Sequence, residues 1–418
     1  MEAEQQDVKK SLYPWVIWGV GALFFCFGFF LRVSPSVMVS ELMRDFAIGA
    51  AALGNLTAFY FYAYGAAQLP VGMLLDRYGP RRVLSSAVLV CGAGCLLFGF
   101  ADVIFQAYAG RLLIGLGCAF AFIGTLKIIS LWFPIRRAAL VTGLTAMVGM
   151  AGAVGGQAPL AMLVDFVGWR TSIIGGSFFA VALALMIIVF VRDRPPSMAV
   201  VARPSLRGTI VRDLGVVLRN DQTWCASAVI ATVSVPLLAY AGLWGVPHMM
   251  SAYGLERPEA ASATSMILIG WGMGAPIIGW LSDKTGKRKP ALVFGSFFAF
   301  AALLCLIYVP GIPVWGAFAL LFVNGFAGGA TVVSYVVARV HNPPASAATA
   351  SSVVNMAPVL LSAAFQALLG WLLDAQWDGA LVDGARVYAE SAYQMAFLPL
   401  IACAVIAMIG ALRVREVR

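Results

Sequence analysis

The sequence predicts an all-α membrane protein with twelve transmembrane helices, arranged as two related six-helix bundles. Three observations predict this fold class. Hydrophobic residues make up 61% of the 418 residues and charged residues only 11%, too few charges to cover the surface of a soluble protein of this size. The apolar residues gather in runs of about 20, the length that a helix needs to cross a bilayer. A charged motif also occurs twice, once in each half of the chain.

The apolar runs account for the twelve predicted helices, because short segments rich in Lys, Arg, Gly or Pro separate them. All seven Cys fall inside these runs without the spacing of metal ligands, so we expect small buried side chains and no metal site. The runs cover residues 13–40, 50–74, 83–101, 104–131, 139–163, 171–192, 223–250, 260–281, 290–308, 313–338, 347–373 and 392–412.

The distribution of Lys and Arg predicts the orientation, because cytoplasmic loops are enriched in these residues. With the first residue in the cytoplasm, 21 of the 28 basic residues lie in cytoplasmic segments and three lie within helices. Four lie outside: Arg44, Arg170, Arg257 and Arg386. We therefore expect both termini in the cytoplasm and explain the net charge of +9 by topology, with no nucleic-acid partner.

A polar stretch divides the chain. Residues 193–222 contain two adjacent Pro and five Arg, and six apolar runs lie on either side. We expect a cytoplasmic linker at 193–222, an N-terminal bundle at 1–192, and a C-terminal bundle at 223–418 with a short cytoplasmic tail.

The two copies of the charged motif, "GMLLDRYGPRR" and "GWLSDKTGKRK", begin 207 residues apart, and each follows the second helix of its half. Their register predicts two copies of one six-helix unit, which is a transporter architecture. The residues concerned are Gly72, Asp76, Arg77, Gly79, Arg81 and Arg82 in the first copy, and Gly279, Asp283, Lys284, Gly286, Arg288 and Lys289 in the second.

This pattern resembles the signature loop of the major facilitator superfamily, and other segments are similar to that family over essentially the whole chain. "GRLLIGLGCAF" (110–120) resembles its helix 4 motif, "WFPIRRAALVTG" (132–143) its loop before helix 5, and "GWR" (168–170) its entry to helix 6. The resemblance implies the major facilitator fold. It also implies that Arg111 is the motif arginine, which holds helix 4 to its neighbours or assists coupling.

The resemblance further implies that the charged loops are conformational latches. In the family the Asp lies near the cytoplasmic N-terminus of helix 11, where a carboxylate meets free N–H groups and the positive end of the helix dipole. Asp76 would then close the cytoplasmic side, and Gly79 would permit a tight turn. The alternative is that the loops only hold positive charge in the cytoplasm, which leaves the Asp and Gly residues without a role.

Arg32, in "CFGFFLRVSPSVM", is the candidate for binding an anionic substrate. It lies deep in the first helix, where an Arg is costly and normally faces a cavity or a partner. A guanidinium forks onto carboxylate or phosphate oxygens, and the segment resembles helix 1 of organic-anion and phosphate-ester porters. The alternatives are that Arg32 reaches the outer headgroups, or that it pairs with Glu41 or Asp45.

Polar and aromatic residues at helical spacing suggest a polar central path. Each set shares one helix face, although bonds between helices and interfacial aromatics are an alternative role for each residue. Lys127 is either a cavity residue or one that reaches the cytoplasm. The further candidates are Tyr60, Tyr64 and Gln68; Tyr240, Trp244 and His248; Asn324 with Tyr335; and Asn355 with Gln366.

The sequence thus predicts a transporter, secondary active or facilitative, that moves a small organic anion across the cytoplasmic (inner) membrane by rocker-switch alternating access. No Asp or Glu lies in the middle of a predicted span, so proton coupling would need His248, Glu41 or Asp45. An exporter of drugs or amphipathic cations is the alternative, disfavoured by the missing acid and by Ala153 in place of the antiporter motif's Pro. A transporter-like sensor is a further alternative. We expect no enzyme activity, no cofactor, and a monomer in the bilayer.

Overall fold

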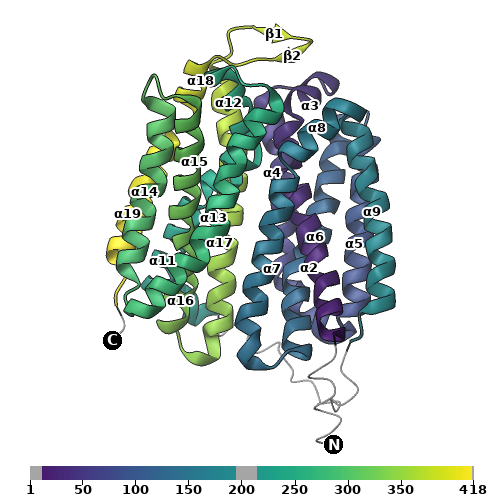
Figure 1. Cartoon of the computed structure of the whole chain (residues 1–418), viewed down its shortest axis with the longest axis vertical. Helices are drawn as coiled ribbons and strands as arrows, with labels where there is room; N and C mark the ends of the chain where they lie inside the picture. The colour runs from purple at the N-terminus through teal and green to yellow at the C-terminus, as the bar shows by residue number, and fades with distance from the viewer. Residues whose placement is uncertain (1–11, 194–213, 417–418) are drawn as a thin grey trace, which may run out of the picture.

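The computed structural model describes residues 12–193 and 214–416, and these residues are almost wholly helical (Figure 1). The helices of the first half stand together, and those of the second half stand beside them. The first half contains α2 (Tyr13–Val33), η1 (Ser34–Val37), α3 (Val39–Asp45), α4 (Ala50–Tyr78), α5 (Pro80–Gly99), α6 (Ile104–Trp132), α7 (Ile135–Gly155), α8 (Ala158–Val167) and α9 (Trp169–Phe190).

The second half repeats the pattern of long helices with more interruptions. One short antiparallel hairpin, in which Leu381 pairs with Arg386, caps one end of the molecule. The elements are α11 (Asp221–Val233), η2 (Pro236–Trp244), α12 (Gly245–Tyr253), α13 (Arg257–Thr285), α14 (Lys289–Tyr308), α15 (Val314–Gly328), η3 (Gly329–Thr331), α16 (Val332–Val340), η4 (Pro344–Ser346), α17 (Ala347–Ala375), β1 (Leu381–Val382), β2 (Ala385–Arg386), α18 (Glu390–Ala396) and α19 (Pro399–Arg413).

The predicted membrane helices are confirmed. Eleven segments of the described residues are long and apolar enough to cross a membrane, and α3 with the first part of α4 makes a twelfth if this pair, bent by 110°, is one span. Each of the twelve predicted runs corresponds to a helix or a broken helix. Residues 194–213 of the predicted linker lie outside the described residues, so the division into bundles at 1–192 and 223–418 stays a prediction.

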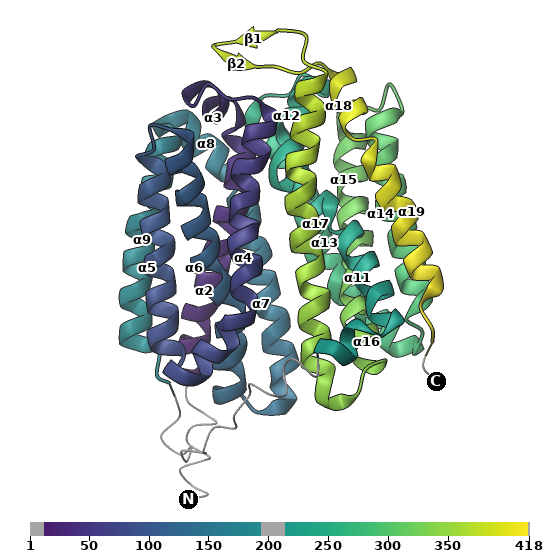
Figure 2. The same ribbon diagram turned by 180° about the vertical axis from the view of Figure 1, so that it is seen from behind.

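The two ends of the molecule carry different parts of the chain. The first and last described residues, Leu12 and Glu416, lie at one end, which we call the terminal end; the opposite end carries β1 and β2, and we call it the hairpin end (Figures 1 and 2). The chain crosses between these ends with each long helix. Both copies of the charged motif therefore lie at the terminal end, where α4 and α13 finish.

Glycines permit the close approach of α4 and α17, which belong to different halves and lie side by side in Figure 2. A Cβ atom on Gly54 would lie 2.2 Å from the carbonyl oxygen of Gln366, and one on Gly370 would lie 2.2 Å from that of Ala50. Further along α4, a Cβ on Gly65 would still meet Leu360 at 3.6 Å, whereas one on Gly72 would meet nothing within 4 Å. The two helices are therefore in backbone contact at the hairpin end and separate toward the terminal end.

Candidate functional site

Arg32 lies in the last turn of α2 inside a cage of aromatic rings. Its side chain is buried, with 9% exposure. The guanidinium carbon lies 4.3 Å from the ring centroid of Phe29, 4.9 Å from that of Tyr64 and 5.9 Å from that of Phe61. Its Nε donates a hydrogen bond of 3.3 Å to the hydroxyl of Tyr60. Ring faces stabilise a cation without removing its charge, so the cage holds a guanidinium that can still bind an anion.

A second buried guanidinium lies on the same tyrosine. The guanidinium carbon of Arg111, on α6, lies 5.0 Å from the ring centroid of Tyr60, and that of Arg32 lies 5.5 Å from it. Arg111 is fully buried, and its Nη1 donates a 2.9 Å hydrogen bond to the carbonyl oxygen of Leu31. Close packing explains this position, because a Cβ on Gly115 would lie 2.1 Å from the carbonyl oxygen of Tyr60. Arg111 thus holds α6 to α2, in line with one of the roles that the sequence suggested.

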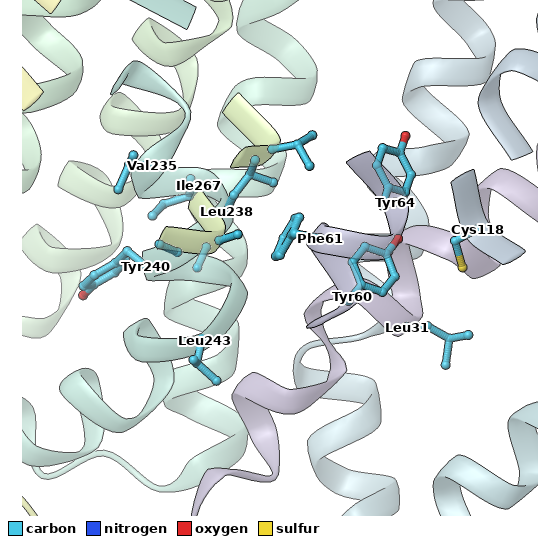
Figure 3. Packing of buried hydrophobic residues seen from close by; sticks show 14 of the residues in the cluster. Leu31, Tyr60, Phe61, Tyr64, Cys118, Val235, Leu238, Tyr240, Leu243 and Ile267 are labelled. Atoms are coloured by element: carbon cyan, nitrogen blue, oxygen red, sulfur yellow. The ribbon is translucent and has the colours of Figure 1, made fainter. Parts of the chain in front are cut away.

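Neither arginine is paired with a carboxylate of the described residues, in which every Asp and Glu lies in a loop or near a helix end. The acids weighed as partners of Arg32 have others: Glu41 pairs with Arg257, and Asp45 accepts from Arg44 at 3.1 Å. Cys118 lies beside the cluster (Figure 3), with its Sγ 3.6 Å from that of Cys91. The aromatic cage therefore carries positive charge that the described carboxylates leave uncompensated.

Tyr60 and Tyr64 share one face of α4, as predicted, and their rings stack with centroids 5.9 Å apart. Gln68 continues this stripe one turn further toward the terminal end. Its Nε2 is buried without a hydrogen-bond partner among the described residues. A polar face thus runs along α4 from the cage toward the end at which α4 and α17 separate.

Tyr240, Trp244 and His248 lie inside the second half. Tyr240 and His248 share a 2.8 Å hydrogen bond, and Trp244 donates to the carbonyl oxygen of Gln366 at 3.1 Å. All three are at most 1% exposed. Figure 3 shows Tyr240 on the opposite side of Phe61 from Tyr60. In this conformation these three predicted substrate residues pack the interior of the second half rather than the Arg32 cage.

The predicted amides also make bonds between helices. Asn324 donates to the carbonyl oxygen of Ala299 at 2.7 Å, and Gln366 donates to that of Leu238 at 2.8 Å. Asn355, on α17, accepts a 2.8 Å hydrogen bond from the hydroxyl of Tyr335. Asn324 and Gln366 are at most 2% exposed, whereas Asn355 is half-buried. Of the three amides, only Asn355 thus keeps part of its surface open.

The latch residues lie at the terminal end without the contact that the resemblance implied. Asp76 accepts from Lys127 of α6 at 2.8 Å, so neither residue contacts α17 or the cage through this pair. In the second loop Asp283 pairs with Arg288 of the same loop at 2.5 Å. Arg77 and Lys284 of the two loops are exposed, and their charged groups lie over the rings of Tyr78 and Trp280.

Gly79 forms the tight turn that the sequence predicted. Its φ is +81°, in the region that favours glycine. A Cβ there would also lie 2.3 Å from Asp193, whose carboxylate accepts from the backbone N–H of Arg81 at 2.8 Å and so caps α5. In the second loop Gly286 has φ +68°, and Glu416 accepts from the N–H groups of Arg288 and Lys289. Each loop is thus anchored by an acid from the end of its own half.

Sequence reasoning missed three residues that join the two halves at the hairpin end. Gln157, fully buried between α7 and α8, donates to the carbonyl oxygen of Ala241 at 2.7 Å. Asp374 accepts from the backbone N–H groups of Ala50 and Ala51 at 3.0 and 2.9 Å. Arg257 pairs with Glu41 at 2.5 Å. Two sequence features could have indicated them: Gln157 is a lone polar residue within an apolar run, and Asp374 is an acid at the end of one.

A cavity of about 560 Å³ lies apart from this cluster, between α13, α14 and α15 toward the terminal end. Its lining is almost wholly apolar and includes Phe294, Phe298, Phe322 and Phe326. Phe294 is 63% exposed and Phe298 is 50% exposed, so the cavity opens on the outer surface of the helices. Its apolar walls suit hydrocarbon, and a polar substrate would find few partners there.

The family model described as Major Facilitator Superfamily matches residues 20–366. The probable sulfoacetate transporter SauU of Cupriavidus necator is 23% identical over 65% of this chain and 66% of its own length. The membrane sensor protein UhpC of Salmonella typhimurium is 26% identical over 67% of this chain and 66% of its own length. Both alignments therefore span slightly less than two thirds of the relative.

A solved structure shows the same fold. The bacterial homolog of the human lysosomal transporter Spinster, in an inward-facing and unoccupied conformation, superposes with a TM-score of 0.78 at 19% identity, over 96% of each chain. Fold and family thus agree with the two charged loops and the helix 4 motif. The chain belongs to the Major Facilitator Superfamily and is a multi-pass membrane protein.

Proposed function

We propose that this transporter moves a small organic anion across the cytoplasmic (inner) membrane and that Arg32 binds the anion. The terminal end would face the cytoplasm with both termini, because most of the basic residues lie there. The observation that carries the proposal is the buried guanidinium of Arg32, held by aromatic rings and unpaired with any described carboxylate.

The chemistry of the cage favours an anion over a cation. A buried cation is costly unless an opposite charge meets it, and a substrate carboxylate, sulfonate or phosphate supplies that charge. Arg32 presents a planar fork that fits such groups in a bidentate manner. The name of the similar protein SauU refers to sulfoacetate, which is a small organic anion of this kind. A drug or cation exporter would need a carboxylate, and the described acids lie near helix ends.

Alternating access of the rocker-switch type agrees with the contacts between the halves. Backbone contacts of α4 with α17 and the bonds of Asp374, Arg257 and Gln157 join the halves at the hairpin end. At the terminal end, the ion pairs of the described residues join partners from the same half. A site at Arg32 closed from the hairpin end and reached from the terminal end would suit the cytoplasm-facing state of such a cycle.

A sensor is the second candidate, because the similar protein UhpC is named a membrane sensor. The two functions share a binding site and differ in turnover. Purified protein in liposomes decides between them: a transporter accumulates or exchanges a labelled anion at many molecules per protein, whereas a sensor binds the anion without moving it.

The test of the proposed site is the affinity of the purified protein for anions, measured by calorimetry with a panel of carboxylates, sulfonates and phosphate esters. We expect Arg32→Ala to weaken affinity for the binding anion by roughly ten- to a hundredfold, since a charge-assisted bond contributes about 1.5–3 kcal/mol. Arg32→Lys should recover only part of it, because an ammonium lacks the fork.

Arg44→Ala is the matched control, since it removes one positive charge from an exposed side chain of α3 outside the cage. Its affinity and melting temperature should equal those of the unaltered protein. An Arg32→Ala variant with unchanged affinity would show that Arg32 does not bind the substrate. Collapse of its melting temperature without ligand would instead mark Arg32 as a structural residue.

A further inference from the structure

We infer that the substrate carries two negative charges and that Arg111 supplies the second positive charge of the site. This inference rests on the proposed function, because it assumes that an anion binds at Arg32. It adds the charge of the substrate and a positioning role for a residue that, in the structure, otherwise only holds α6 to α2.

Arg111 has hydrogen-bond donors that its contact between α6 and α2 does not use. Its side chain is fully buried, yet only Nη1 has a partner, the carbonyl oxygen of Leu31. Nε and Nη2 are buried without hydrogen-bond partners in the described part of the chain. A residue that served only to join α6 to α2 could do so with a neutral donor, which would avoid burying an unpaired charge.

The two charges are close together. Both guanidinium carbons lie near the ring centroid of Tyr60, Arg32 at 5.5 Å and Arg111 at 5.0 Å, so they can be at most about 10.5 Å apart, the sum of the two distances. Tyr60 is fully buried, and its hydroxyl, which accepts from Arg32, donates to the carbonyl oxygen of Gly28 at 3.4 Å. Two cations at this spacing in a dry interior repel each other unless negative charge arrives.

The described protein groups around the cluster leave this charge uncompensated. Neither arginine belongs to an ion pair of the described residues, and Glu41 and Asp45 are engaged by Arg257, Arg44 and Arg170. The Sγ atom of the neighbouring Cys118 lies 3.6 Å from that of Cys91, and a thiol brings no charge to the cluster. The cage therefore carries a charge of +2, which a dianion balances and a monoanion balances only by half.

Arg111 acts through space in this proposal. Its exposure of 0% keeps it from touching the substrate, while Arg32 makes the contact. A charge within about 10 Å of the bound anion, in a medium of low effective dielectric, changes the affinity for one further unit charge by roughly tenfold or more. The expected signature is a preference between anions that differ only in charge.

The test uses matched pairs of probes at pH 7.5 with the full-length purified protein. The pairs are sulfoacetate and its methyl ester, D-glucarate and D-gluconate, and glucose 6-phosphate and glucose 6-sulfate; the first member of each carries one more charge. We expect the dianion of any pair that binds to bind at least tenfold more tightly than its monoanion. Equal affinities, or tighter binding of the monoanion, would overturn the inference and leave an anion site at Arg32 intact.

Variants of Arg111 separate its charge from its packing. Arg111→Met fills the space without charge, so the affinity should fall about tenfold for the monoanion and about a hundredfold for the dianion, because each unit of negative charge loses the same attraction. The preference for the dianion should therefore fall about tenfold. Arg111→Lys keeps the charge and should keep the preference. Arg44→Met is the control and should leave both affinities unchanged.

A dianion preference that survives Arg111→Met would exclude Arg111 as its source. If Arg111→Met does not fold, the paired affinities of the unaltered protein still decide the charge of the substrate. Failure of every anion in the panel to bind would overturn the proposed function itself, an outcome distinct from equal binding within a pair.

Discussion

Two aspartates end helices that run side by side, yet they do different things. Asp374 finishes α17 at the hairpin end and accepts hydrogen bonds from the first N–H groups of α4 in the other half. Asp76 lies near the finish of α4 at the terminal end, where the equivalent contact would be to the start of α17. Asp76 pairs instead with Lys127 of its own half. Among the described residues, the same carboxylate-to-helix-start contact is thus made at one end of the molecule and not at the other.

The surroundings of Asp374 explain why its contact is strong. Its carboxylate also accepts from the hydroxyl of Tyr388 at 2.6 Å and from Arg386 at 3.1 Å. Burial, followed by the bond to Asp374 and the charge of that group, raises the pKa of Tyr388 above its usual range, so the hydroxyl stays a donor at neutral pH. Asp76 has a single, half-exposed partner. The fuller hydrogen-bond network thus lies at the hairpin end, where the two halves are joined.

The largest effect is expected from Asp374→Ala, which removes the carboxylate that accepts from the N–H groups of Ala50 and Ala51 at the start of α4. Loss of a charged cap with several hydrogen bonds should weaken the closed hairpin end by about 3 kcal/mol. In a variant without native cysteines, spin labels at Phe105 and Trp315, both exposed at this end, should move apart. Asp378→Ala, in the loop after Asp374, is the control and should leave the distance unchanged. An unaltered distance in Asp374→Ala would show that the glycine contacts and the bonds of Arg257 and Gln157 hold this end without Asp374.

A smaller effect is expected from Arg257→Gln. Arg257 pairs with Glu41 and Asp165 of the other half, and its loss leaves Glu41, with a side-chain exposure of 15%, without a cation. The cost should be about 2 kcal/mol, because these groups keep some contact with water. The same spin-label distance measures it, with Glu259→Gln on the exposed face of α13 as the control. A variant as closed as its control would remove the ion pair from the account of the hairpin end.

The smallest effect on stability is expected from Asp76→Asn. Its ion pair with Lys127 is half-exposed, with side-chain exposures of 48% and 34%, and such pairs contribute roughly 0–1 kcal/mol. The melting temperature should stay the same. If Asp76 caps α17 in the opposite state, as the latch hypothesis requires, transport should fall, and labels at Leu140 and Val340 should report a more open terminal end. Normal transport with unchanged distances would leave the loop as a topological signal alone.

The shared face of Tyr60 and Tyr64 could be predicted from the sequence because α4 is a regular α-helix there. Tyr60 and Tyr64 are one turn apart in an α-helix, so the pattern places them on one face, and they stack. Tyr240 and Trp244 have the same spacing, but they lie in η2, a π-helix whose wider turns alter the angle between residues. Their sequence pattern resembles that of α4, so only the coordinates reveal the difference.

The contacts between the halves could not be predicted for another reason. The partners of these contacts lie far apart in the chain, with separations of 84 residues for Gln157 and 324 for Asp374. Arg257 likewise pairs with Glu41 of the other half. Local residue spacing carries no information about such distant partners. The repeated loops predicted that both charged motifs lie on the same side as the termini. They did not indicate that the helix-start contact is made at the hairpin end in this conformation.

The glycine contact between α4 and α17 also determines how far the opposite end of α4 would move if this helix rotated about the contact. Gly54 lies against Gln366 near the hairpin end, while Asp76 lies 22 residues further along the same helix, roughly 33 Å away at 1.5 Å per residue. A rigid rod hinged at Gly54 and turned by about 10° would therefore carry Asp76 through roughly 6 Å, while the backbones at the glycine stay in touch. With backbone contact kept at Gly54, such a rotation would move Asp76 by about one helical turn.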